Sequence, residues 1–215
     1  MLTREQFLPH EMRIVAALRM QGASDEQVIV RVKSENLFQY PTERMVANRA
    51  TVCLRRLDAM VPTDAVCAAR GIDPKTAVEA ASSLARLMAS GTPTQADQAI
   101  FYSMICCYDI VRELVLVEVG ERLQNFDYAF TAVDLNAFMT RFTTEYPDAA
   151  RWTEPRSSAL RLAPPDAPPC RPYRRGPGPG VRALSPLFLD SDVERALVQL
   201  GEQSLIAALT GRAVM

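Results

Sequence analysis

Hydrophobic positions recur at helical spacing along most of the chain, and no segment alternates as a half-buried strand would. In the first sixty residues the pattern predicts three helices, at about 10–20, 25–35 and 42–58. Ser24 and Gln27 form a capping box for the second of them. We therefore expect a mainly α fold that begins with a helix-turn-helix-like unit over residues 1–62.

Helix-start signals organise the rest of the chain. Cap residues followed by proline, glutamine or an acid predict helix starts at Asp73–Pro74, Thr92–Gln95 and Thr131–Asp134. These helices should form a second bundle over residues 72–154, with a break near Asp109. Ser191 with Glu194 then predicts another helix within a C-terminal helical segment, residues 184–215.

Residues 155–183 differ from the rest of the chain in composition. They hold eight of the fifteen prolines and six arginines, with Asp166 as their single acid. Because proline removes backbone donors and breaks helices, we expect an irregular Pro/Arg/Gly-rich segment that packs no core. Such a segment is typical of a linker, and its positive charge would also suit a basic arm lying along phosphates.

The third predicted helix has two contrasting faces. One face is apolar and consists of Val46, Ala50, Cys53, Leu54 and Leu57. The opposite face carries polar residues about one turn apart and no acid, namely Arg44, Asn48, Thr51 and Arg55, flanked by Arg49 and Arg56. Arginine, asparagine and threonine reach phosphates and base edges in a major groove, which favours DNA binding. The alternative is an ordinary solvated helix face, where arginine is simply a good helix former.

The net charge of -1 conceals an uneven distribution. Residues 1–60 carry nine bases against seven acids, residues 61–150 six against twelve, and residues 151–183 seven against two. The acidic middle disfavours a surface that is basic all round. Any contact with a polyanion must therefore be local, at the third helix or at the basic segment.

Catalytic and metal-binding patterns are missing from the sequence. His10 is the only histidine, the five cysteines form no CxxC pair, and there is no Gly-rich phosphate loop. We therefore expect no enzyme, no metal and no cofactor. The N-terminus lacks the apolar region of a signal peptide, and the apolar stretch 99–119 contains charged residues, so we expect a cytoplasmic protein without a membrane span.

The order of these elements resembles the BrxA family, a small helical protein of bacterial BREX (bacteriophage exclusion) phage-defence systems. The resemblance lies in hydrophobic spacing over Gly22–Val28, Ser34–Leu37, Cys53–Leu57, Ala99–Ile105, Val111–Val115, Leu184–Leu189 and Val193–Leu197. It implies a non-enzymatic protein of helix-turn-helix character that binds double-stranded DNA and works beside other phage-defence proteins. By position in the pattern, the family's basic helix corresponds to the helix carrying Arg44, Asn48, Arg49, Arg55 and Arg56.

Residues 155–183 depart from the family pattern, where a further helix is expected. A compensated pair of frameshifts in a GC-rich gene would produce such a frame-altered segment, and so would a natural linker. The function also has an alternative. A helical adaptor could dock a partner of the same defence complex through the acidic middle or the apolar residues 184–189, without touching DNA.

Overall fold

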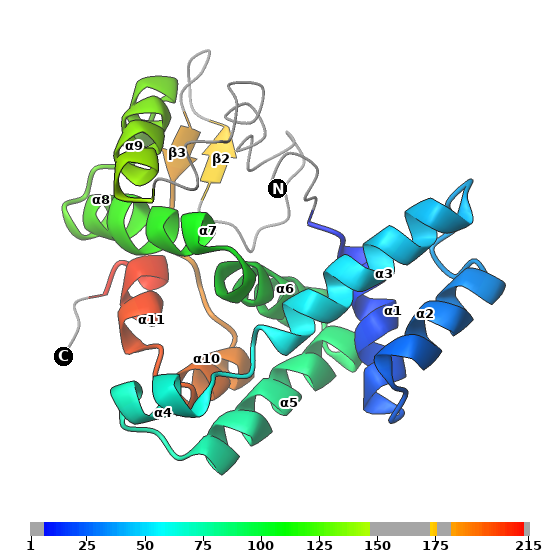
Figure 1. Cartoon of the computed structure of the whole chain (residues 1–215). Coiled ribbons are helices and arrows are strands. Elements are labelled where there is room, and N and C mark those ends of the chain that lie inside the picture. The colour runs from blue at the N-terminus through cyan, green and yellow to red at the C-terminus, as the bar shows by residue number, and fades with distance from the viewer. Residues whose placement is uncertain (1–6, 147–172, 176–181, 213–215) are drawn as a thin grey trace. The chain divides into compact units, whose positions relative to one another are not determined.

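The computed structural model describes residues 7–146, 173–175 and 182–212 and divides the chain into two compact units. The helical unit contains residues 7–109 and 189–203, and the sheet-containing unit contains described residues from 110–188 and 204–215. Helices make up nearly all of the described regular structure (Figure 1). The prediction of a mainly α fold is confirmed.

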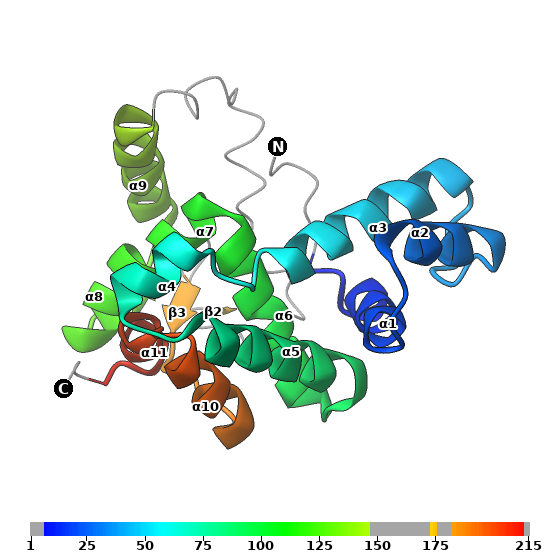
Figure 2. The same ribbon diagram turned by 60° about the horizontal axis from the view of Figure 1, so that its bottom comes forward.

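The helical unit is built around one central helix. Its helices are α1 (Pro9–Met20), α2 (Asp25–Ser34), α3 (Glu43–Asp58), α4 (Asp64–Arg70), α5 (Pro74–Ser90), α6 (Pro93–Cys107) and α10 (Ser191–Gln199). Helices α1, α6 and α10 all pack against α5, which Figure 2 shows alongside α6 and α10. Met12 and Val15 of α1 and Leu84 and Met88 of α5 are completely buried, so this contact forms the core.

The compact units differ from the boundaries expected from the sequence. Residue 62 does not separate two units, because α1 packs against α5 and α3 packs against α6. The three N-terminal helices therefore share one core with the helices that follow. The C-terminal segment is divided instead: α10 belongs to the helical unit, and nearly all of α11 (Gln203–Thr210) belongs to the other.

Most of the predicted helix starts are confirmed. Ser24, Asp73, Thr92 and Thr131 each cap a helix by accepting a hydrogen bond from a backbone N–H group. The prediction for α10 is wrong by one residue, because Asp190 and not Ser191 is its cap. Helix α4 was not predicted: its Thr63 cap and left-handed Gly71 end lie in a stretch that looked like a separator.

The sheet-containing unit combines short helices with a small sheet. Its elements are α7 (Asp109–Glu113), the π-helix η1 (Leu114–Val119), α8 (Gly120–Gln124), β1 (Ala129–Phe130), α9 (Ala132–Glu145), β2 (Tyr173–Arg175), β3 (Arg182–Leu184) and α11. The strands are antiparallel in the order β1-β3-β2. Ala183 is central and pairs with Ala129 on one side and Arg174 on the other.

Two of these strands correct the expectation for residues 155–183. Strand β2 and most of β3 fall inside this segment, which the sequence predicted to be irregular throughout. Pairing with β1 supplies partners for backbone groups without any alternating side-chain pattern, so periodicity gave no sign of it. Residues 155–172 and 176–181 lie outside the described part of the chain.

The described residues also show the lengths of the apolar helices and the state of four cysteines. None of the described helices is long and apolar enough to cross a membrane. Among the described residues, Cys53, Cys67, Cys106 and Cys107 form no disulfide, and Cys53 and Cys67 are buried. Cys170 lies outside the described residues.

Candidate nucleic-acid interface

Helix α3 is fixed in the helical unit by its apolar face. Thr42 caps it by accepting a hydrogen bond from the Met45 N–H group at 3.3 Å. The five predicted inward residues, Val46, Ala50, Cys53, Leu54 and Leu57, are all buried. Burial of this stripe against α1, α2 and α6 sets which residues of α3 face outward.

The opposite face of α3 is polar and accessible. Arg44, Asn48, Thr51 and Arg55 are exposed, and Arg49 is half-buried beside them. Within the part of the chain that the structure describes, Arg44 and Asn48 have no hydrogen-bond or ion-pair partner. The structure therefore brings the predicted stripe together on one side of a single helix.

The hydroxyl of Thr51 is already committed to its own helix. It donates to the Ala47 carbonyl oxygen at 3.0 Å, one turn earlier. In this rotamer Thr51 accepts hydrogen bonds but has no proton left to donate to a phosphate. Its place in the stripe suits a base amino group better than the phosphate backbone.

Arg56 does not belong to this accessible face. It is completely buried, donating through Nη1 to the Phe7 carbonyl oxygen and through Nε to the Tyr108 hydroxyl, both at 3.4 Å. At 0% exposure its guanidinium is not accessible to DNA, so we leave it out of the candidate interface. Arg56 is buried, unlike the exposed arginines of α3, because it lies at the edge of the apolar face rather than on the polar side.

The acids at the two ends of α3 are paired with bases from other helices. Glu43 at the start lies 3.3 Å from the Lys33 ammonium of α2, between its Oε2 and Nζ. Asp58 at the end accepts from Arg19 of α1 at 2.9 Å, and Arg19 also pairs with Asp25. These acids are thus engaged away from the stripe, which keeps its positive character.

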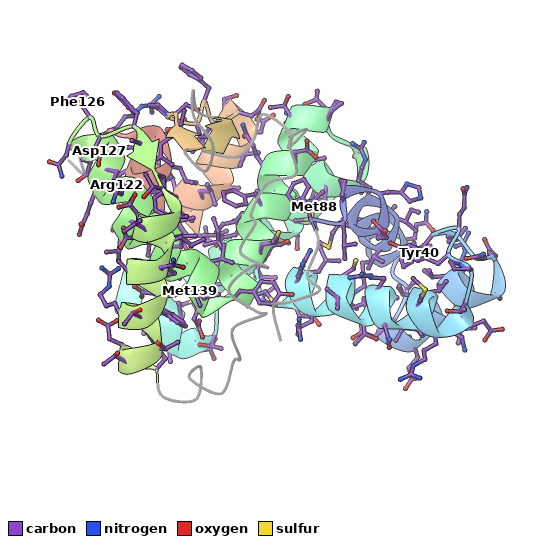
Figure 3. The ribbon with its side chains drawn as sticks, turned by 90° about the horizontal axis from the view of Figure 1, so that it is seen from above. Tyr40, Met88, Arg122, Phe126, Asp127 and Met139 are labelled. Carbon is purple, nitrogen blue, oxygen red and sulfur yellow. The ribbon has the colours of Figure 1, made fainter. Side chains whose placement is uncertain are left out.

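The connection between α2 and α3 is ordered by hydrogen bonds to side chains. The Asn36 amide donates to the Tyr40 carbonyl oxygen at 3.0 Å and accepts from the Tyr40 N–H group at 3.1 Å. Phe38 is 5% exposed and its ring lies edge-on to that of Tyr40, so the connection is also held by an aromatic contact. The Tyr40 hydroxyl donates to the Glu11 carboxylate of α1, and Figure 3 shows Tyr40 beside α1. Sequence reasoning missed Asn36 and Glu11, because both are polar residues outside the apolar pattern.

The sheet-containing unit holds a cluster of opposite charges around Arg122. Arg122 pairs with Glu118, Asp127 and Asp134, and Arg141 joins the cluster through Glu118. Figure 3 shows Arg122 and Asp127 as neighbours. Hydrogen bonds from Thr131 and the Arg122 charge lower the pKa of Asp134. These carboxylates are matched by guanidinium groups, which is typical of a structural ion-pair network.

The described residues contain no group of three or more side chains placed to hold a metal ion. Within the described part of the chain, the basic face of α3 gathers exposed arginines together with Asn48 and Thr51 on one side of a single helix. The fold and this face define a helical protein with an arginine-bearing outer helix.

Comparison with protein families names that class more closely. The BrxA family model matches residues 1–162, which is most of the chain, and the protein belongs to the BrxA family. It is accordingly a component of a BREX phage-defence system. No similar curated protein and no similar solved structure was found. The match ends inside the Pro/Arg/Gly-rich segment and does not reach the resemblance seen at residues 184–215.

Proposed function

We propose that the protein binds duplex DNA through the exposed face of α3, as a non-enzymatic accessory component of its BREX system. The observation that carries the proposal is the acid-free stripe of Arg44, Asn48, Thr51 and Arg55, displayed opposite a fully buried face. Helix α2 and helix α3 would then act as supporting and recognition helix of a helix-turn-helix.

The length of the stripe suits a major groove. Arg44 and Arg55 are eleven residues apart in a continuous helix, so their backbones are separated by about 16 Å along its axis. A major groove is about 12 Å wide, so two arginines at this separation reach phosphates on both sides of it. Asn48 and Thr51 lie between them, over the base edges. Phosphate contacts would supply most of the affinity, with limited sequence readout.

The accessory, non-catalytic role rests on the side chains that the sequence provides. His10 is the only histidine and is exposed at the start of α1, so any nucleophile–base pair that uses a histidine would have to be built on this one residue. In this proposal the protein acts in the cytoplasm, where it holds DNA for other proteins of the defence system. Incubation of plasmid DNA with the protein and Mg²⁺ should leave the DNA uncut; reproducible cleavage by homogeneous protein would contradict this role.

A charge-matched pair of variants tests the DNA-binding face. Replacing Arg44, Arg49 and Arg55 by alanine should weaken binding to random duplex DNA and reduce the slope of log K against log salt by about three. The control variant replaces three exposed bases elsewhere in the helical unit by alanine, Lys75, Arg86 and Arg195. It has the same net charge but should keep most of the affinity. Equal losses in both variants would mean that net charge, and not α3, determines binding.

A second candidate function rests on exposed apolar side chains in the sheet-containing unit. Phe188 is 90% exposed, Phe126 is 78% exposed and Val133 is 75% exposed (Phe126 is labelled in Figure 3). Such residues are typical of contacts with another protein, so an adaptor that docks a defence-system partner is the alternative. Absence of DNA binding even at low salt would favour the adaptor over the DNA-binding protein.

A further inference from the structure

Two arginines of α3 converge on one phenol. Arg55 donates through Nη2 to the Tyr108 hydroxyl at 2.9 Å, and its Cζ lies 5.5 Å from the ring centroid. Arg56 donates through Nε to the same hydroxyl at 3.4 Å, with its Cζ at 5.4 Å from the centroid. Both distances to the ring fall within the range of cation–π contacts.

The backbone places Tyr108 where this contact is possible. Helix α6 ends at Cys107, and Tyr108 takes an extended conformation with φ -133 and ψ 107 before the next helix begins. Tyr108 is 9% exposed, so it is held by packing rather than by the arginines alone. Because α6 also packs against α3, Tyr108 is a fixed point for the C-terminal part of α3.

An uncharged partner has a particular consequence for Arg55. A carboxylate would orient the guanidinium but would also cancel its charge, whereas a phenol orients it and leaves the charge. Partial burial lowers the pKa of Arg55, but its interactions with Tyr108 and Cys107 outweigh this effect and raise the pKa above its usual value. Tyr108 thus restricts the Arg55 side chain without placing a negative charge beside it. Restricting a long side chain before binding reduces the entropy lost when the complex forms.

We propose that Tyr108 is a positioning residue for the DNA-binding face: its hydroxyl and ring hold the Arg55 guanidinium in place for a phosphate while leaving its charge intact. The inference rests on the proposed function, because it concerns the same face of α3. It extends the binding site to a residue directly after the end of α6, one that does not itself touch DNA.

The test compares Tyr108→Phe in two backgrounds. Phenylalanine keeps the ring but removes the hydroxyl, so binding to random duplex DNA should weaken by about threefold to tenfold. The salt slope should stay that of the unmodified protein, because no charge is lost. In an Arg55→Ala background, Tyr108→Phe should have no further effect. Tyr128→Phe, at an exposed tyrosine, is the control and should bind normally.

The outcomes separate this inference from the proposed function. If the unmodified protein binds DNA and Arg55→Ala weakens binding, but Tyr108→Phe does not, the positioning role is overturned and the DNA-binding face stands. Equal losses from Tyr108→Phe in both backgrounds would show a general structural effect and also overturn it. No binding by the unmodified protein removes both proposals.

A second variant covers the case in which Tyr108→Phe does not fold. Arg55→Lys keeps the charge at an exposed position but cannot reproduce the planar guanidinium contact with a phenol. It should bind DNA about threefold to tenfold more weakly, with unchanged thermal stability and unchanged salt slope. Binding as tight as that of the unmodified protein would overturn the positioning role.

Discussion

The Tyr40 hydroxyl donates to the Glu11 carboxylate, which ties the α2–α3 connection to α1 beneath the candidate DNA-binding helix. Glu11 is only 8% exposed, so it depends on this donor for part of its solvation. Tyr40→Phe should lower the free energy of unfolding by about 1–3 kcal/mol, because a hydrogen bond to a charged group is lost. Urea unfolding measures the change, with Tyr128→Phe as control. A loss no larger than that of the control would mean that the bond contributes nothing.

The same pair predicts a dependence on alkaline pH. Burial and the hydrogen bond to Glu11 raise the pKa of Tyr40 from 10.0 to about 12. The folded state therefore holds this proton more tightly than the unfolded state, and the resulting stability is complete below pH 10. It should be lost as the pH rises from 10 to 12. Urea midpoints measured across this range should fall more steeply for the unmodified protein than for Tyr40→Phe, and parallel curves would contradict the raised pKa.

Arg55 and Arg56 are neighbours in sequence but should respond differently to substitution. Arg56→Ala removes a fully buried side chain and its hydrogen bonds, so we expect a loss of about 3 kcal/mol in the free energy of unfolding. Arg55→Ala, at an exposed position, should change it by less than about 1 kcal/mol. Thermal or urea unfolding of the two variants compares them directly. Similar small losses would show that Arg56 is not structural.

Arg55 and Arg56 also show how much of the candidate site could be predicted from the sequence. Spacing along α3 correctly separated Val46 and Leu57 from Arg44 and Asn48, because helical periodicity is a local property. Arg56 lies at the edge between the faces, and its burial depends on Tyr108, which is distant in the sequence. Periodicity carries no information on such a tertiary contact, so Arg56 was grouped with the accessible arginines.

The fold shows the same division between local and distant causes. The caps at Ser24 and Thr131 were predictable, since a cap and its partner lie three residues apart. The small sheet was not predictable, because β1 pairs with β3 across a long stretch of chain. Each strand is also too short to show alternating apolar and polar side chains. The division into units likewise depends on packing between α1 and α5, which no local signal reports.

The ion pair between partly exposed Arg70 and buried Glu202 should be strongly coupled. Glu202 is 2% exposed, and its Oε1 accepts from Arg70 at 2.9 Å and from the Tyr102 hydroxyl at 3.2 Å. Arg70→Met leaves a buried carboxylate without its cation, so we expect a loss of about 3–5 kcal/mol. Adding Glu202→Gln removes the stranded charge and should restore part of that loss.

A double-mutant cycle measures this coupling by urea unfolding. Arg70 also donates to the Leu200 carbonyl oxygen at 2.8 Å, so the restoration should be incomplete. If the two single losses simply add in the double variant, the ion pair does not act as a unit.

Gly120 should be intolerant of a methyl group, even though it lies in a helix. A Cβ atom there would lie 2.8 Å from the Ala208 Cβ and 3.2 Å from its Cα, closer than such atoms approach without displacement. Replacing a helical glycine by alanine gains about 1 kcal/mol from propensity, whereas overpacking costs about 1–3 kcal/mol. We therefore expect Gly120→Ala to destabilise the protein, because α11 must move away from α8.

The matched rescue is Ala208→Gly, which removes the methyl group that Gly120→Ala would strike. Alone it should cost about 1 kcal/mol, since it places a glycine inside α11. Combined with Gly120→Ala it should restore most of the stability, because one methyl group then occupies the space at this contact. Thermal unfolding of the two single variants and the double variant shows whether Ala208→Gly restores the stability lost in Gly120→Ala. A double variant less stable than either single one would mean that the helices do not meet at these two residues.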